Sequence, residues 1–426
     1  MERTSKVMSP SRPSRPSIAP SSSVPPASKA SLKGQASPDP QPSFNTDEMR
    51  AQADEFRNYI ARWVDERLIP QAQSLDEKGE FSRELFKELG ELGYYGAMYP
   101  ESIGGSGLKY PYTCFTVLCE ELARGSLGFA AGVCMQGSTA THTIFQWGHA
   151  SLHEKYLKPA LAGDKIGAFA ITEPNSGSDV ASLRTRATQT DGGYILNGSK
   201  MFTSNGTVAD FITVVATTDP SKGLKGLDLF LVDTATPGFS VGRRLEKFAA
   251  HASDTAELVF ENVFVPDTCR LNDGAPGGFL NAYKSLTVDR IFTAALALGN
   301  GRAAYDAALK YAGERCQFGR PIGKFQTVQF KLVDMLAKLE QASLYTYHAA
   351  ALADQGLPIT TEAALSKIIA GDGCNEVCQM AMSIFGGYGL MNEYPAQRFL
   401  RDSYFPLVGG GTSDIMRLIV ARQLGF

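Results

Sequence analysis

Two segments are rich in small hydroxyl, amide and turn-forming residues. Each follows directly after a run of apolar or mixed residues. Thr172–Asp179 reads Thr-Glu-Pro-Asn-Ser-Gly-Ser-Asp and follows the run Gly167–Ile171, and Lys200–Gly206 reads Lys-Met-Phe-Thr-Ser-Asn-Gly. Backbone N–H groups and hydroxyls at a strand end can bind the heteroatom edge of a flat cofactor, while the strand side chains flank its ring. Taken alone, the first segment would more often be an ordinary Pro-Gly turn closed by a side-chain hydrogen bond. The second segment repeats the combination, which favours a cofactor site.

A further set of candidate residues lies in the last third of the chain. Arg315 and Gln326 flank Phe318–Arg320, which reads Phe-Gly-Arg. Gly386–Gly389 (Gly-Gly-Tyr-Gly) and Gly409–Ser413 (Gly-Gly-Gly-Thr-Ser) follow. Together with the first two segments they form an ordered set of motifs rather than one isolated turn.

The elements that must position these motifs change in character along the chain. Apolar residues such as Phe56, Ile60 and Trp63 recur at spacings of three and four, which predicts helices, and Thr46 or Asp47 would cap the first. Short runs rich in Val, Ile, Thr and Phe then predict strands, before Ala-rich and Leu-rich helical segments return. Because strands and helices do not alternate, the pattern argues against a doubly wound sheet. The segments predicted are helices 112–123, 152–161, 288–313, 325–355 and 360–385 and strands 211–218, 227–232 and 255–260.

The sequence therefore predicts an α+β multidomain chain. Its parts are an extension 1–43, an N-terminal helical domain 44–165, a central β domain 166–272 and a C-terminal helical bundle 273–426. The extension holds 12 Ser and 9 Pro and scarcely any large apolar side chain, so it cannot offset its ordering entropy and is expected to be disordered. Its six Lys and Arg against two acidic residues also allow an organellar transit peptide, although the prolines oppose the amphipathic helix that such a peptide needs.

Composition narrows the possible partners. The net charge of −3 supplies no basic patch, so nucleic acid is not expected as a partner. No apolar run is long enough for a membrane span and no secretory signal is visible, so we expect a cytoplasmic location, or the mitochondrial matrix if 1–43 is a transit peptide. His149 and His153 have the spacing of a helical metal pair but no third ligand, and Cys374 and Cys378 are expected to pack as core residues. We therefore expect no metal.

The ordered motifs resemble the acyl-CoA dehydrogenase family. The resemblance covers about Asn45 to Phe426, and its most specific elements are the patterns TEPxxGSD, KxFxSNG and RxxFGxxI. It implies a helical N-terminal domain, a central β domain and a C-terminal four-helix bundle, with FAD at their junction and a homotetramer as the usual assembly.

The resemblance also implies roles for individual residues. Those implied to contact the FAD of the same chain, with Ser178 also near substrate, are Phe169, Ile171, Thr172, Ser178, Phe202, Ser204, Thr412 and Asp414. Those implied to reach the FAD of the partner subunit are Arg315, Phe318, Gln326 and Gly387. Two positions depart from the common pattern, because Ser383 stands where many relatives have Gln, and Asp414 where they have Gln or Glu.

Chemistry of this class requires a carboxylate that removes the α proton of an acyl thioester, while the β hydrogen passes as hydride to flavin N5. Many relatives carry this base as a Glu in the loop where this chain has Gly410. Isovaleryl-CoA dehydrogenase and some long-chain relatives carry it on the first long helix of the C-terminal domain, and Asp289 stands there in this chain. The alternative is that Asp289 is an exposed or salt-bridged helix residue. Arg290 would line the substrate site or pair locally.

The function implied is FAD-dependent α,β-dehydrogenation of a thioester carried on CoA or on an acyl carrier protein, with Asp289 as base. The electron acceptor would be electron-transfer flavoprotein or oxygen. The three glycines at 409–411 leave room for a branched or substituted chain. Two other hypotheses for the function stay open. The protein could be a flavin-dependent monooxygenase of the same fold, or a catalytically silent subunit that binds flavin or a partner enzyme.

Overall fold

The structure is a computed structural model that describes residues 46–272 and 278–426. The described residues all belong to one compact unit. The extension predicted at 1–43 lies outside the described residues, so its disorder stays a prediction. The join predicted at 272/273 borders the undescribed residues 273–277.

The first part of the described chain is helical, as predicted. Its first helix begins after Thr46, whose Oγ1 accepts a hydrogen bond from the N–H of Met49 at 3.2 Å. Apolar side chains at helical spacing, such as Ile60, Phe86 and Leu89, are buried in one core. The helices are α1 (Asp47–Trp63), α2 (Ile69–Lys78), α3 (Arg83–Glu91), α4 (Pro111–Met135), α5 (Thr141–Trp147), α6 (Ala150–Leu152) and α7 (Lys158–Leu161), joined by the single turns η1 (Val64–Leu68), η2 (Tyr94–Met98), η3 (Glu101–Ile103), η4 (Gln136–Ala140) and η5 (His153–Leu157).

Helix α4 is longer than the segment 112–123 predicted for it, since it continues to Met135. The added half is rich in glycine, which lowers helix propensity. The sequence pattern therefore did not predict that the helix continues here. A Cβ placed on Gly125 would lie 2.8 Å from Leu68 Cδ2, so this helix approaches its neighbour too closely for a larger residue. A kink at Ser126, with φ −157° and ψ 107°, divides the two halves.

A mixed seven-stranded sheet forms the middle of the chain. Its order is β1-β4-β2-β3-β7-β6, with β5 paired to β4. Strand β4 is buried along its whole length, and its sequence is apolar except for Thr213 and Thr217. Strands β4, β5 and β7 confirm the three predicted strand segments. The strands are β1 (Gly167–Ala170), β2 (Arg186–Thr190), β3 (Gly193–Ser204), β4 (Phe211–Thr217), β5 (Leu227–Asp233), β6 (Phe239–Arg244) and β7 (Thr255–Pro266), with the short turns η6 (Val180–Ser182), η7 (Pro220–Gly226) and η8 (Asp267–Cys269).

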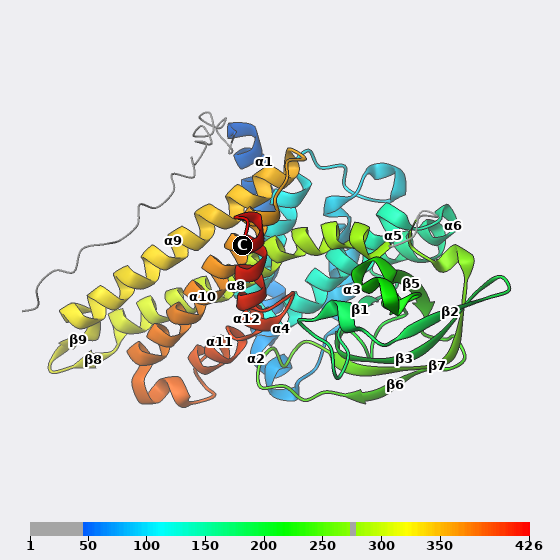
Figure 1. The fold of residues 1–426 in the computed structure, drawn as a ribbon. Coiled ribbons are helices and arrows are strands. Elements are labelled where there is room, and N and C mark those ends of the chain that lie inside the picture. The colour runs from blue at the N-terminus through cyan, green and yellow to red at the C-terminus, as the bar shows by residue number, and fades with distance from the viewer. Residues whose placement is uncertain (1–45, 273–277) are drawn as a thin grey trace, which may run out of the picture. The chain divides into compact units, whose positions relative to one another are not determined.

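Long helices return after the sheet, and α8, α9 and α10 run side by side away from it (Figure 1). Their Ala-rich faces share a core in which Cys374 and Cys378 are buried, as expected of packing residues. Gly301 of α8 allows the close approach, because a Cβ there would lie 3.0 Å from Cys374. The elements are α8 (Gly278–Glu314), α9 (Gln326–Asp354), α10 (Thr360–Phe385), α11 (Ala396–Asp402), α12 (Phe405–Val408) and α13 (Ser413–Gln423), with the hairpin β8 (Cys316–Gln317) and β9 (Arg320–Pro321) and the turns η9 (Ile322–Lys324) and η10 (Gly386–Leu390).

A buried group of charges joins the two helical parts. Glu120 of α4 is 1% exposed and pairs with Arg57 of α1 at 2.8 Å and with Arg302 of α8 at 2.7 Å. Tyr347 of α9 donates to Glu120, and Arg57 also pairs with Glu121. The group links helices from the first and last thirds of the chain.

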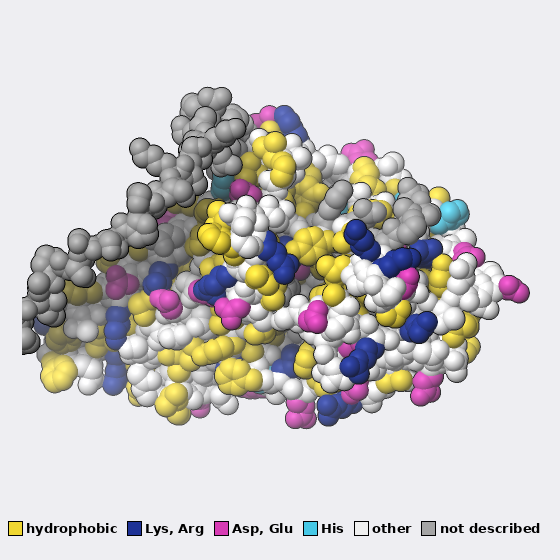
Figure 2. All heavy atoms as spheres, viewed as in Figure 1, with side chains coloured by type: hydrophobic (Ala, Val, Ile, Leu, Met, Phe, Trp, Pro, Cys, Tyr) yellow, Lys and Arg dark blue, Asp and Glu magenta, His cyan; other side chains and the backbone are white. Residues whose placement is uncertain are grey.

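Charged side chains of both signs are interspersed over the face shown in Figure 2. Along the part of the chain that the structure describes, no helix is long and apolar enough to cross a membrane.

Candidate active site

The two hydroxyl-rich segments meet at one edge of the sheet. Thr172 follows the end of β1, and Met201 lies near the end of β3. The N–H of Met201 donates to the carbonyl of Thr172 at 2.8 Å, and Lys200 Nζ donates to the carbonyl of Ile171 at 3.0 Å. Segments about thirty residues apart in the sequence therefore form a single ledge, which we define as Ile171, Thr172, Phe202 and Ser204.

A buried ion pair supports the ledge from beneath. Lys200 is fully buried and pairs with Glu173 at 2.8 Å, and Glu173 also accepts from the N–H groups of Arg184 and Thr185 at 2.7 and 2.9 Å. Burial lowers the pKa of Lys200 to about 8. Burial would raise the pKa of Glu173, but Lys200 and the hydrogen-bond donors outweigh it and hold that pKa below its usual value. Both side chains were missed as site residues, although Glu173 lies in the first motif segment and Lys200 begins the second.

The ledge has the surface that a flat conjugated ring requires. The ring of Phe202 is 67% exposed, and its backbone is held at φ +59°. Ile171, Thr172 and Ser204 are partly exposed beside it. A Cβ on Gly177 would meet only Thr172 Cγ2, at 3.9 Å, so the space next to the ledge is open. An uncovered aromatic face with hydroxyls and open space beside it fits the isoalloxazine of FAD.

Phe169 and Ser178, two of the residues predicted to contact the flavin, are not part of the ledge. The side chain of Phe169 in β1 is 6% exposed and packs into the main hydrophobic core. Ser178 is exposed in the turn that follows β1. Contact of Phe169 with a cofactor would therefore involve its strand backbone rather than its ring.

The predicted base, Asp289, is partly buried against η4. Ser138 of η4 donates from Oγ to Asp289 Oδ1 at 2.7 Å, and Cys134 Sγ lies 3.9 Å from the same oxygen. Burial raises the pKa of Asp289 above its usual value, against the opposing effects of Ser138, Arg290 and Lys367. Among the described residues no ion pair joins Asp289 to Arg290. The alternative role of Asp289 as the partner of a local salt bridge with Arg290 is therefore not supported.

Gly410 and Asp289 face each other although they come from different elements. Gly410 has φ +66°, and a Cβ built on it would lie 3.5 Å from Asp289 Oδ2 and 3.3 Å from Thr293 Oγ1. The carboxylate of Asp289 thus lies where a side chain from the glycine loop would enter the site.

Lys367 of α10 fixes the glycine loop from below. Its buried Nζ donates to the carbonyls of Pro406 and Gly411 at 2.7 and 2.6 Å. Burial lowers its pKa to about 8. The sequence motifs assign no role to this residue, which appears there only as a Lys within an Ala-rich and Ile-rich helical segment.

Arg290 is nearly fully buried next to the base. Its guanidinium lies over the ring of Tyr283 at 4.9 Å, and its Nη1 is 3.5 Å from Thr287 Oγ1. Its Nε has no hydrogen-bond partner among the described residues. Arg290 therefore keeps donor capacity that a ligand could use.

The residues predicted to reach a partner's cofactor form a separate group. Arg315 lies 5.2 Å over the ring of Tyr388, next to Gly387 in η10, and Phe318 is 94% exposed at φ +49°. Gln326 begins α9 and is exposed. Figure 1 shows β8 and β9 at the far end of the bundle from β1 and β3. Within one chain this group therefore lies apart from the ledge.

The two positions that depart from the family pattern lie at helix surfaces. Asp414, one residue into α13, pairs with Arg417 at 3.3 Å. Thr412 caps this helix, since its Oγ1 accepts from the N–H of Ile415 at 3.2 Å. Ser383 of α10 accepts a hydrogen bond from Lys331 at 2.5 Å. The hydroxyl of Thr412 can therefore still donate a hydrogen bond to a further acceptor. The carboxylate of Asp414 is paired with Arg417.

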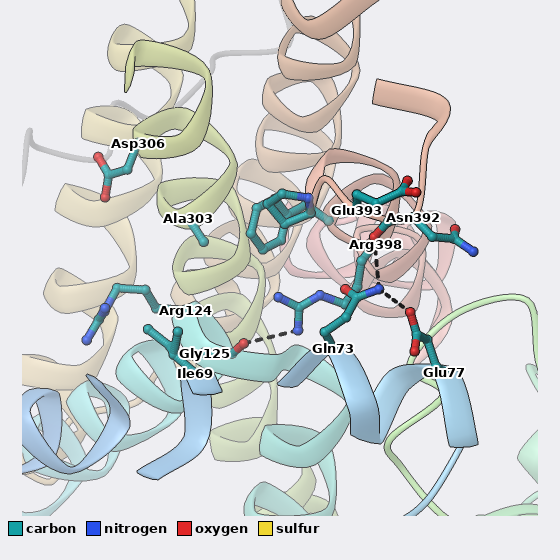
Figure 3. Close-up of a pocket in the computed structure, with 12 residues that line it drawn as sticks. Ile69, Gln73, Glu77, Arg124, Gly125, Ala303, Asp306, Asn392, Glu393 and Arg398 are labelled. Carbon is teal, nitrogen blue, oxygen red and sulfur yellow. Dashed lines mark hydrogen bonds between the residues drawn. The ribbon is translucent and has the colours of Figure 1, made fainter. Parts of the chain in front are cut away.

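A cavity of about 710 Å³ lies elsewhere, between α2, α4, α8 and α11 (Figure 3). Arg398 points into this region and donates to the carbonyl of Gly125 at 3.2 Å. The described residues that line the cavity include none of the predicted site residues. Its size alone does not make it the reaction site, because the groups with chemistry are at the ledge and at Asp289.

Family models match nearly the whole described chain. The acyl-CoA dehydrogenase N-terminal, middle and C-terminal domain models match residues 50–164, 168–263 and 277–425. The chain belongs to the acyl-CoA dehydrogenase family. This confirms the family resemblance, the three-part fold and the prediction of a flavoprotein oxidoreductase. Members of this family are FAD-dependent, so FAD is the cofactor.

Individual relatives are similar over most of their length. The chain is 46% identical over 379 residues to benzylmalonyl-CoA dehydrogenase of Aromatoleum aromaticum, covering 89% of this chain and 98% of the relative. A solved structure described as the electron transferring flavoprotein of Acidaminococcus fermentans matches with TM-score 0.86 and 37% identity, over 90% and 100% of the two chains. Butyryl-CoA dehydrogenase of Megasphaera elsdenii matches with TM-score 0.85 and 38% identity, over 87% and 97%.

Proposed function

We propose that this enzyme dehydrogenates an acyl-CoA thioester between its α and β carbons, with Asp289 taking the α proton. The observation that carries the proposal is the 3.5 Å between Asp289 Oδ2 and a Cβ built on Gly410. A carboxylate from α8 thus reaches the place where a loop Glu would enter. Bound FAD supplies the acceptor for the β hydrogen.

The remaining steps belong to the chain's own residues. Burial raises the pKa of Asp289, which makes the carboxylate a stronger base for a weakly acidic carbon. The N–H of Gly410 is available to the thioester carbonyl, and Lys367 holds the loop that carries it. The ledge, backed by the pair of Lys200 and Glu173, would hold the flavin ring.

We further propose a branched or substituted acyl group. The three glycines at 409–411 add no side chain to the site, and the relative with 46% identity is named for a benzyl-substituted malonyl thioester. A carrier-protein thioester is the alternative. Paired CoA and carrier-protein substrates with the same acyl group would decide between them by their kcat/KM values.

We also propose a homotetramer whose FAD sites are shared between subunits, because the Arg315 group and the ledge are separated within one chain. The proposed electron acceptor is electron-transfer flavoprotein, which the description of one matching structure names. Oxygen is the alternative. Reoxidation of the reduced enzyme by each acceptor would separate them.

The decisive experiment is anaerobic flavin reduction by a panel of acyl-CoA thioesters, for wild type and Asp289→Asn. We expect wild type to bleach, and Asp289→Asn to keep its flavin and bind thioester but reduce the flavin about a hundredfold or more slowly. Absence of bleaching by every thioester would favour a silent subunit. Oxygen uptake with added reduced flavin, at a rate unchanged in Asp289→Asn, would favour a monooxygenase.

A further inference from the structure

The hydroxyl of Ser138 lies between two acceptors. Its Oγ is 2.6 Å from the carbonyl oxygen of Cys134 and 2.7 Å from Asp289 Oδ1. Both distances suit a strong O–H···O hydrogen bond. A serine hydroxyl carries one proton, so it can donate to only one of these oxygens at a time.

We propose that Ser138 is a positioning residue whose hydroxyl turns between Asp289 and the carbonyl of Cys134 as Asp289 loses and gains a proton. This inference rests on the proposed role of Asp289 as base. When Asp289 is ionised, Ser138 donates to Oδ1. When Asp289 has taken the α proton, its O–H donates to Ser138 Oγ, and the serine proton turns to Cys134. Ser138 keeps its own proton throughout.

Because Ser138 is buried, a hydrogen bond lost here is not readily replaced by one to water. Ser138 is 3% exposed, so water cannot readily supply a missing partner. A polar group left unpaired in such a place costs about 1–3 kcal/mol. With two acceptors around one hydroxyl, Asp289 Oδ1 keeps a hydrogen bond to Ser138 in both protonation states, and no heavy atom has to move.

The other groups that face the carboxylate do not duplicate this contact. Cys134 Sγ, from α4, is 3.9 Å away and is a weak donor. Lys367 of α10 is committed to two loop carbonyls, and Arg290 of α8 is stacked on Tyr283. Among the described residues, neither cation forms an ion pair with Asp289, so both act on it only at longer range.

A second hydrogen bond joins α5, which directly follows η4, to the same helix α8. His142 lies four residues after Ser138, and Ser285 lies four residues before Asp289. His142 Nδ1 and Ser285 Oγ are 2.6 Å apart. Since this contact and the surrounding core remain when Ser138 is changed, the variant should fold.

The test measures the carboxyl group itself. Infrared difference titration of the flavin-loaded enzyme without thioester follows the protonated carboxyl band that disappears in Asp289→Asn. In Ser138→Ala the ionised form loses a donor and the protonated form loses an acceptor. Because the hydrogen bond to the charged carboxylate is the stronger of the two, the pKa of Asp289 should rise by about one pH unit. The acid limb of flavin reduction should move to higher pH by the same amount. Ser138→Thr, which restores a hydroxyl, should titrate as wild type.

Thr143→Val is the matched control, because Thr143 is buried and donates to a carbonyl four residues back, at 2.9 Å from Thr139. It should leave the titration unchanged. If Ser138→Ala fails to fold, Ser138→Thr and Ser138→Val differ only in the hydroxyl and decide the question. An unshifted titration without the hydroxyl, or an equal shift in Thr143→Val, would overturn the inference. A wild-type reduction rate in Asp289→Asn would instead overturn the proposed function.

Discussion

Asp289 and Gly410 approach the same point from a helix and from a loop. The shorter side chain of Asp is compensated by its place on α8, where Ser138 orients one oxygen and leaves the other toward Gly410. In the proposed mechanism, the position of the carboxyl oxygens therefore matters more than the element that carries them.

Lengthening the base tests its reach. Asp289→Glu adds one methylene and should stay active, with flavin reduction slowed up to about a hundredfold because a misplacement of about 1 Å can cost that much. Anaerobic stopped-flow reduction of the bound flavin measures the effect. Complete inactivity with normal flavin content would contradict it.

Moving the base to the loop is the complementary change. In Asp289→Asn, adding Gly410→Glu should rescue reduction only in part, because a non-glycine residue at φ +66° is strained by about 1 kcal/mol. The same stopped-flow assay compares the double variant with Asp289→Asn alone. Full wild-type rates would show that the loop relaxes without cost.

At the scale of the elements, the ledge depends on the ion pair beneath it. Glu173→Gln leaves the ammonium of Lys200 buried without its counter-charge, which should cost about 3 kcal/mol and weaken flavin binding. The pKa of Lys200 should fall below its present value of about 8. The pKa of Lys200 in the unfolded chain is near 10.5. At pH values between the folded-state pKa of the variant and 10.5, Lys200 binds more protons in the unfolded chain than in the folded one. The stability of the variant should therefore rise with pH over this range.

Melting temperatures at pH 7 and pH 9.5, at fixed protein and FAD concentrations, measure this loss. The double variant Glu173→Gln/Lys200→Met removes both charges and should recover most of the stability. A deficit that grows with pH, or that persists fully in the double variant, would contradict the explanation.

The sequence predicted the elements better than the contacts between them. Helices α9 and α10 were predicted within one residue at each end, because their apolar periodicity is regular. The second half of α4 was missed because its glycines mask a helix that only close packing stabilises. Motifs placed Asp289 and Gly410 in the site, where they do meet. Ser138 and Lys367 carried no motif, and their partners lie 151 and 39 or more residues away in the chain.

At the scale of the whole molecule, the proposed shared site assigns the Arg315 group to the FAD of another chain. Arg315→Ala should weaken FAD binding by about tenfold or more and loosen the oligomer, because a charge-assisted contact to phosphate is lost. FAD titration and sedimentation measure the two effects, with the exposed Arg243→Ala as control. A monomer with full FAD affinity would contradict the shared site.

Removal of residues 1–43 should leave flavin content, melting temperature and flavin reduction nearly unchanged, because that segment lacks apolar anchors. The truncated protein is compared with the full chain in all three measurements. Loss of folding would show that the segment docks on the body. Loss of cellular location alone would favour the transit-peptide alternative over a cytoplasmic location.

The buried group at Glu120 has a consequence for synthesis on the ribosome. Arg57 and Glu120 emerge early, but Tyr347, which bonds to both, follows Arg57 by 290 residues. Until that part of the chain is made, the acidic pair of α4 lacks two of its partners, Arg302 and Tyr347, and its burial is unfavourable. The N-terminal helices therefore cannot complete their native packing during translation as an independent unit. Their final burial waits for α8 and α9, so their apolar and charged surfaces stay exposed until those helices are made.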